Sequence, residues 1–508
     1  MNAPELNQAI VSAQPDKPRP HSRHMLKITP LVIGIYISIF VSGCAVGPDY
    51  EKPSIQEPAQ FKENRGWLQV APLATPSPSN WWTIYGDDML NQLEPRVATA
   101  NQSLRASFYA YQQALALTSL ARSAEFPNAG ASVSAISSSA TGAGGSGAPA
   151  TVTTDTAAIS ASWAPDLWGK VRRQVEANEA SAEAGRENLA AAQLSLQTTL
   201  AQNYFQIRQL DSQTALAKET VSADEKFLQL TQNRYAAGVA SKADVAQAQV
   251  QLANARVQVV AFSVQRAQLE HAIAVLIGEP PSNFSLVAVT GLPQAQAVPA
   301  GLPSQLLLRR PDLVAAERLV AAANAQIGVA KSAYFPSLTL AAQGGWRSST
   351  FSNLISAPNE IWSFGPTLAA TLFDGGAHSA QYSQSKSAYQ QVVAQYRQLS
   401  LQALQQVEDQ LAAITILGEE EKLQQQAIQA ADDSLRLATN SYKAGAVSYL
   451  NVLTAQTAAY TARNAALQTG GQKLTASVAL IQALGGRWGV DEPATAEAAV
   501  VQQKNESK

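Results

Sequence analysis

The sequence has 508 residues, only 15% of them charged, and its formal net charge at pH 7 is −2. A nucleic-acid-binding protein normally carries a basic surplus, so this balance argues against that class. The single cysteine excludes a disulfide framework and a cysteine-clustered zinc site, and the four histidines are too scattered to suggest a metal cage. Because no run of 18 or more apolar residues occurs, we expect no transmembrane helix.

The N-terminus has the pattern of a secretory signal peptide. The apolar run at 31–41 is too short to span a bilayer, and Arg23 and Lys27 precede it. We therefore expect a signal peptide at 1–43, with Met25 as a possible true start.

This run ends in Val41-Ser42-Gly43-Cys44, which resembles the bacterial lipobox, and Cys44 is the only cysteine in the chain. We expect the Cys44 thiol to carry a lipid; a buried free cysteine is the alternative. Ala45 follows instead of an aspartate, which by analogy with lipoprotein sorting favours the outer membrane. A Cys44→Ser protein should lose its lipid, which mass and membrane partition would report.

The body of the chain is a duplication. Residues 233–249 align with 440–456 at an offset of 207, and residues 121–127 align with 330–336 at an offset of 209. A nearly constant offset makes chance unlikely, so each half is expected to hold the same elements.

The longest elements are predicted to be helices. No proline interrupts 166–279 or 367–492, and both windows are rich in Ala, Gln and Leu. Residues 171–237 can form one helix of 67 positions, about 100 Å long at 1.5 Å per residue, and 376–444 can form its counterpart. Such helices need others beside them, although a two-stranded coiled-coil rod would also explain them.

Each long helix ends at a glycine, Gly238 or Gly445, which suits a left-handed C′ position. Ser241 and Ser448 can then cap a second helix. The sequence thus predicts two long helical hairpins with tight turns, at 171–278 and 376–485.

Strand-like segments lie between the helices, and strand pairs are expected at 129–163 and 337–373. Within 337–346, Leu338 and Leu340 share one face while polar residues share the other. An apolar, aromatic-ended face about ten residues long is typical of a membrane β-barrel strand; a soluble hairpin packed on a helix is the alternative. Since four strands cannot close a barrel and lipid permits no open edge, the chain must oligomerise, and three copies would give 12 strands.

Short motifs then occur in this order along the chain: Cys44–Tyr50, Trp81-Trp82, Tyr85–Asp88, Tyr235–Gly238, Leu302–Leu313, Tyr442–Gly445 and Ala483–Gly486. Together they resemble the TolC-like outer-membrane factors of tripartite efflux systems, and most closely the lipoprotein subfamily paired with resistance-nodulation-division pumps. The resemblance implies an α+β membrane protein, a homotrimer with a 12-stranded outer-membrane β-barrel, a long α-helical periplasmic barrel and an equatorial belt. It also implies docking to a periplasmic adaptor protein and an inner-membrane pump, and no nucleic acid.

On this reading the chain divides into a signal peptide at 1–43, a lipidated N-terminal and equatorial segment at 44–97, a first repeat at 98–290, a linker at 291–311, a second repeat at 312–486 and a polar tail at 487–508.

The resemblance also assigns candidate residues. The helical tips are expected to contact the adaptor and to close the duct; they contain Arg234, Tyr235, Gly238, Asp244, Tyr442, Lys443, Gly445, Val447, Tyr449, Leu450 and Asn451. Plain turn chemistry is the alternative for these positions. An aromatic girdle at the membrane interface is expected from Trp163, Trp346, Trp362 and Phe364, whereas Trp81, Trp82 and Trp168 should pack internally.

Relatives often carry acidic residues near the constriction, which favour cations. Here the residue after Gly445-Ala446 is Val447, so closure by Val447 and Leu450, supplemented by Asp244, is the hypothesis; Val447→Asp should alter leak or conductance.

Catalysis has no support. Gly142–Gly147 has the spacing G-x-G-x-x-G but precedes a strand rather than a helix, so it is expected to be a loop. We therefore expect no enzyme and no cofactor beyond the lipid, and a passive duct for small amphiphilic compounds in the outer membrane. The alternatives are a type I protein-secretion duct, a periplasm-spanning coiled-coil lipoprotein and an envelope hydrolase.

Overall fold

The structure is a computed structural model that describes residues 45–55, 58, 60–63, 80–140, 150–294 and 310–486. The expected signal peptide, the lipidation residue Cys44, the Gly142–Gly147 loop, most of the 302–313 motif and the polar tail at 487–508 lie outside this part of the chain.

The duplication is confirmed by helix length. Helices α4 (Lys170–Ala236) and α8 (Ala377–Lys443) each contain 67 residues, and their partners α5 (Lys242–Leu276) and α9 (Tyr449–Ala483) each contain 35. Helices α3 (Gln102–Ser123) and α7 (Pro311–Ser332) each contain 22 residues. The observed ends of α4 and α8 fall within one residue of the expected ones.

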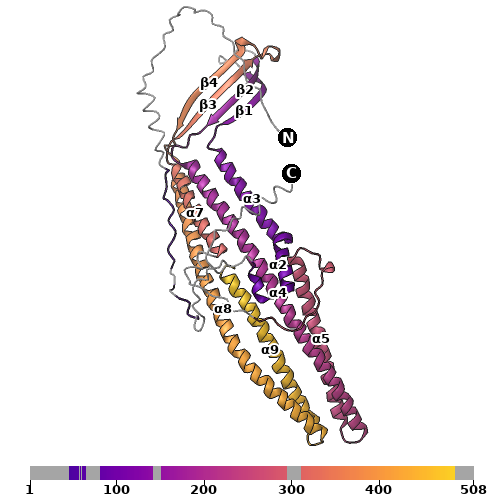
Figure 1. Ribbon diagram of the computed structural model, residues 1–508. Helices are drawn as coiled ribbons and strands as arrows, with labels where there is room; N and C mark the ends of the chain where they lie inside the picture. The colour runs from indigo at the N-terminus through magenta and orange to yellow at the C-terminus, as the bar shows by residue number, and fades with distance from the viewer. Residues whose placement is uncertain are drawn as a thin grey trace, which may run out of the picture. The chain divides into compact units, whose positions relative to one another are not determined.

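Four antiparallel strands form one sheet in the order β1-β2-β3-β4 (Figure 1). They are β1 (Asn128–Ala140), β2 (Ala150–Trp163), β3 (Ser337–Ser348) and β4 (Glu360–Ala369). Each repeat contributes one hairpin, and β2 and β3 join the two hairpins. The β4 strand ends four residues before the expected boundary at Phe373.

The strand register separates an apolar face from a polar face. Ile159, Gly344 and Trp362 lie in one row across β2, β3 and β4. In the next row, Ser160 pairs with Gln343, which pairs with Ser363. Because side chains alternate along a strand, the apolar residues gather on one face and the small polar residues on the other, as the alternation predicts.

The helices pack as a row. Helix α5 lies against α4, α4 also lies against α9, and α9 lies against α8 (Figure 1). Helices α3 and α7 pack on α4, and α7 also contacts α8. Small residues and leucines fill the middle of this row around buried Phe205, Leu411 and Leu474.

Short elements close this core. The 3₁₀ turn η1 (Trp81–Tyr85) and helix α2 (Asp88–Ala100) lie between the N-terminal segment and α3. Trp81 and Trp82 are buried, as expected from the sequence. Three further 3₁₀ turns are η2 (Pro281–Asn283), η3 (Phe351–Asn353) and η4 (Ala357–Asn359).

Helix α7 begins two residues before the expected Leu313 because Pro311 takes the first helical position. The buried Arg310 guanidinium donates to both carboxylate oxygens of Asp312, at 2.9 and 2.7 Å, and to Gln406 of α8 at 2.7 Å. By length and composition α7 alone among the described helices could cross a membrane. Most of it is buried against α4 and α8, so we treat it as a packed core helix.

The segment that follows Cys44 is fastened to the helices. The Val46 amide donates to the Trp168 carbonyl at 3.0 Å, and Arg173 donates to Asp49 at 2.7 Å. A Cβ at Gly47 would lie 2.6 Å from the Gly328 Cα, so only glycine allows this approach. Ala45 thereby lies beside Gly169, the residue before α4.

Candidate functional site

Both helical hairpins end in a tight turn at the same end of the helical row (Figure 1). Gly238 closes the first turn with φ of 72° and Gly445 closes the second with φ of 76°, a left-handed conformation that favours glycine. We call residues 234–244 the first tip and residues 442–451 the second tip. The two expected turns are confirmed in position.

An apolar cluster, here called the tip core, joins the two hairpins. Its fully buried members are Ala248 of α5, Tyr442 of α8, and Tyr449 and Val452 of α9, with Phe227, Leu228 and Leu230 of α4 packed against them. Tyr442 is 3% exposed and Tyr449 is 1% exposed, and their ring centroids are 5.9 Å apart. Both rings therefore hold the hairpins together and present no side-chain surface to an adaptor in this structure.

Arg234 of the first tip covers this core. Its Nη1 donates to the Tyr442 carbonyl oxygen at 2.7 Å, and its guanidinium carbon lies 4.6 Å from the centre of the Tyr442 ring. The Tyr442 hydroxyl is also 3.3 Å from the Thr231 hydroxyl. A cation placed at the last turn of α8 interacts favourably with the negative end of the helix dipole. Arg234 thus connects the end of one hairpin to the end of the other.

Asp244 caps the start of helix α5 in the first tip. Its carboxylate accepts from the Ser241 amide at 2.9 Å, while the Ser241 hydroxyl accepts from the Asp244 amide at 3.1 Å. This reciprocal capping box starts α5. Ser448 occupies the same place before α9, but its side chain makes no capping hydrogen bond. Tyr235, in contrast to Tyr442, is 48% exposed.

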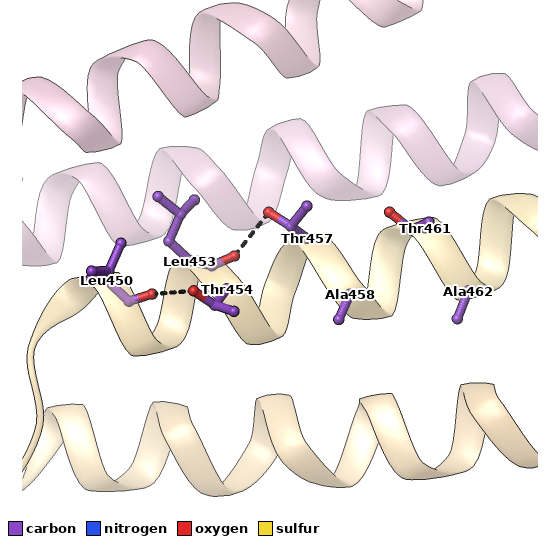
Figure 2. A pocket seen from close by; sticks show the side chains of 7 residues that line it. All are labelled: Leu450, Leu453, Thr454, Thr457, Ala458, Thr461 and Ala462. Atoms are coloured by element: carbon purple, nitrogen blue, oxygen red, sulfur yellow. Dashed lines mark hydrogen bonds between the residues drawn. The ribbon is translucent and has the colours of Figure 1, made fainter.

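The remaining second-tip residues differ in burial. Lys443 is exposed, Val447 packs half-buried against the tip core, and Leu450 is 55% exposed. Leu450 begins a shallow groove along α9 that is lined by Leu453, Thr454, Thr457, Ala458, Thr461 and Ala462 (Figure 2). The Thr454 and Thr457 hydroxyls donate to carbonyls one turn back, each at 2.9 Å. With those hydroxyls satisfied, the groove offers mainly methyl groups.

The tips carry positive charge. Within 234–244 and 442–451 the side chains that are charged at pH 7 are Arg234, Lys242, Asp244 and Lys443, which gives a formal charge of +2 per chain. The only acid among them is occupied as a helix cap. An acidic ring therefore does not form from these residues.

The aromatic residues of the sheet lie at different heights on its apolar face. Trp163 pairs with Leu340 at the helix-proximal ends of β2 and β3, whereas Trp346 pairs with Ala157 six residues further along β2. Six residues correspond to about 20 Å of strand. Trp362, 80% exposed, lies two residues along β4 from the partner of Trp346. Phe364, 73% exposed, lies between the levels of Trp346 and Trp163. This spacing is compatible with two girdle levels and with Phe364 in the apolar band between them.

Two pairs of edges lack a partner within the described residues. The sheet ends at β1 on one side and at β4 on the other. The helical row ends at α5 on one side and at α8 on the other. No group of three or more His, Cys, Asp or Glu side chains that could hold a metal occurs in the described part of the chain. The exposed features are thus edges and tips rather than a polar pocket.

The family model described as outer membrane efflux protein matches residues 95–279 and again residues 302–486. The chain belongs to this family. The two matched ranges coincide with the two structural repeats, so the family match and the duplication describe the same unit.

Curated members of the outer membrane efflux family align along nearly their whole length. A probable efflux pump outer membrane protein, TtgC of Pseudomonas putida, is 30% identical over 91% of this chain and 96% of its own. The cation efflux system protein CusC of Escherichia coli is 28% identical over 89% of this chain and 97% of its own. Both names describe efflux proteins rather than enzymes, which agrees with the expectation that this chain is not an enzyme.

Solved structures agree with the fold. The outer-membrane channel OprN superimposes with a TM-score of 0.81 at 28% identity, covering 88% of this chain and all of its own. A CusC structure gives a TM-score of 0.78 at 27% identity over 87% of this chain. The expected family and its fold class are thereby confirmed, and the chain is an outer-membrane efflux channel component that extends into the periplasm.

The contacts that join the tips were not predicted from the sequence. Arg234 and Tyr442 were expected at the tips but not as a pair, and Asp224 and Gln456, which meet in the interior, were not expected as functional residues. The repeat alignment held a signal for both. Arg234 corresponds to the short Ser441 and Asp224 corresponds to the apolar Ala431, so neither has a polar equivalent of similar reach in the other repeat.

Proposed function

We propose that three copies of this chain close into one passive duct that exports small amphiphilic organic compounds across the outer membrane. The two pairs of unpartnered edges carry this proposal. An open sheet edge would leave backbone N–H and C=O groups unsatisfied in lipid, so β1 of one copy must pair with β4 of the next. Three sheets of four strands give twelve, enough to enclose a lumen.

The helical edges support the same closure. Val250, Val257 and Val264 recur every seven residues on α5 and are 61%, 61% and 55% exposed. On α8, Ile416, Leu423 and Leu437 keep the same register and are 64%, 65% and 57% exposed. Seven-residue apolar repeats are typical of helices that pack side by side. Val257 lies 19 residues after Gly238 and Leu423 lies 22 residues before Gly445, so the two are at similar distances from the tips. Helix α5 of one copy can therefore pack on α8 of its neighbour.

The tip charge supports the proposed cargo class. A formal +2 on each chain would repeat three times around a closed end, and rings of cationic side chains disfavour the passage of metal cations. The groove beside Leu450 is lined mainly by apolar groups of leucine, threonine and alanine side chains. These features favour organic amphiphiles over metal ions as cargo.

The membrane anchor and partners belong to the same proposal. Cys44 carries the lipid, and the described residues that follow it are held against the helices by the Val46–Trp168 and Arg173–Asp49 hydrogen bonds. The exposed tip residues Tyr235, Lys443 and Leu450 contact a periplasmic adaptor, which links the duct to a resistance-nodulation-division pump. No cofactor is needed, because the pump supplies the energy.

Export assays test the cargo class. A strain that lacks the gene should accumulate an amphiphilic fluorescent dye several-fold, and the intact gene should restore efflux. Sensitivity to copper or silver should stay unchanged. Metal sensitivity without dye accumulation would contradict the proposed cargo, and purified protein without single-channel currents in a planar bilayer would contradict the duct itself.

A further inference from the structure

Asp224 of α4 and Gln456 of α9 form a buried polar pair between the two hairpins. Asp224 is 1% exposed and Gln456 is 5% exposed. The Gln456 side-chain amide donates from Nε2 to Asp224 Oδ1. Asp224 lies fourteen residues before Gly238 and Gln456 lies eleven residues after Gly445, on two helices that contact each other.

Two atoms of this pair are left without a hydrogen bond. Asp224 Oδ2 and Gln456 Oε1 are both buried and unpartnered. Both are acceptors, so they cannot satisfy each other unless a proton lies between them. A carboxylic acid and a primary amide can do this, because each then donates once and accepts once.

We propose that Asp224 is protonated when the hairpins are packed together, and that its Oδ2–H donates to Gln456 Oε1. The two side chains then form a cyclic pair of hydrogen bonds that latches the first hairpin to the second. The proton is taken from water when the hairpins close and is returned to water when they separate. We refer to this pair as the latch.

The electrostatic surroundings agree with a protonated latch. Burial raises the pKa of Asp224 to about 6, and the hydrogen bond from Gln456 opposes that shift only in part. Nearby cations are engaged elsewhere: Arg256 of α5 pairs with Glu225 at 2.7 Å, and Arg463 of α9 pairs with Asp432 of α8 at 3.0 Å.

The remaining titratable groups near the latch are weakly acidic or already paired. Tyr449 of α9 interacts electrostatically with Asp224, and the pKa of Tyr449 is raised to about 12, so the phenol stays neutral. Glu219 of α4 faces Arg463 at 3.6 Å. Tyr442 of α8 lies beyond Tyr449 in the tip core.

The sign of the pH effect follows from the pKa. A separated hairpin exposes Asp224 to water and returns its pKa to an ordinary value of about 4. Between about pH 4 and 6 the packed state binds more protons than the separated state, so packing weakens as pH rises through this window. Above about pH 6, the packed state buries a charged carboxylate whose Oδ2 accepts no hydrogen bond. Acid therefore tightens the latch and alkali loosens it.

The latch residues occur in only one of the two possible combinations of the repeats. Asp224 corresponds to Ala431 in the second repeat, and Gln456 corresponds to Gln249, which is exposed. The arrangement therefore arises once per chain, between hairpins that must separate if the tips are to open. The latch rests on contacts within one chain and does not depend on the cargo.

Infrared difference spectroscopy of the full-length protein tests the latch. The wild-type protein should show a protonated carboxyl band that titrates with a midpoint near pH 6, and Asp224→Asn should lack this component. Asp433→Asn, at an exposed carboxylate on α8, is the matched control and should leave the band unchanged. A wild-type spectrum without any band that titrates in this range would overturn the proposal.

A distance measurement tests the mechanical consequence. Spin labels at the exposed turn positions Val239→Cys and Ala446→Cys should move apart, or spread in distance, as pH rises from 4 to 8. In an Asp224→Asn background the amide can make both hydrogen bonds at every pH, so the distance should stay at its acid value. A pH response that persists in this variant would refute the latch. Loss of bilayer conductance alone would challenge the duct and leave this titration intact.

Discussion

The two hairpin tips share one ancestral sequence but occupy different environments. Tyr235 and Tyr442 are equivalent in the repeat, yet Tyr235 is 48% exposed while Tyr442 is 3% exposed. Tyr442 packs inside the tip core with Arg234 over its ring, whereas Ser441, the equivalent of Arg234, is too short to make the same contact with Tyr235. The tyrosine of the second tip therefore stabilises the contact between the hairpins, whereas the tyrosine of the first tip lies at the protein surface.

The largest expected effect comes from removing the buried tyrosine of the second tip. Tyr442→Ala leaves a cavity in the tip core, and a loss of this size costs about 3–5 kcal/mol of local stability. Tyr235→Ala removes an exposed ring and should change stability by no more than about 0.5 kcal/mol. Hydrogen exchange of the tip amides measures both. Equal loss of protection in the two variants would erase the proposed difference between the tips.

Removing Arg234, which connects the two tips, should have the next largest effect on stability. Arg234→Ala loses a charged hydrogen bond to the Tyr442 carbonyl and the contact with its ring, together about 2–3 kcal/mol. Lys443→Ala, at an exposed neighbour, is the control and should have little effect on stability. Current fluctuations in a bilayer, recorded alongside hydrogen exchange, should report more frequent opening only for Arg234→Ala. A quiet Arg234→Ala channel would show that Arg234 does not restrain the tips.

The helix caps give a smaller and more local contrast. Ser241→Ala breaks the capping box of α5 and should cost about 1 kcal/mol, visible as fraying of its first turn. Ser448→Ala should cost almost nothing by the same measurement, because the Ser448 side chain makes no capping bond. If the two serines proved equally costly, the tips would be more alike than their contacts indicate.

The smallest effect concerns charge. Lys443→Glu changes the formal tip charge from +2 to 0 per chain with little effect on stability, since the side chain is exposed. The reversal potential in a salt gradient should shift towards cation preference. Lys422→Glu, on the same helix but away from the tip, is the control. An unchanged reversal potential would place the selective region elsewhere in the duct.

The sequence was sufficient for the elements and insufficient for their contacts. Repeat offsets, long proline-free windows and turn glycines located α4 and α8 to within one residue because these signals are local. Strand faces followed from alternation for the same reason. Which tyrosine is buried depends on how the hairpins lie side by side, and local pattern does not encode that. Comparing the repeats residue by residue would have singled out Arg234 and Asp224, because both lack a polar equivalent of similar reach in the other repeat.

The most direct test of the account is whether the helical edges of neighbouring copies meet. A protein carrying Val257→Cys on α5 and Leu423→Cys on α8 should form disulfides between chains on mild oxidation and give dimers and then trimers as the largest product. Either cysteine alone should give no trimer. Crosslinks confined to single chains, or a ladder extending past three copies, would contradict a closed duct of three chains.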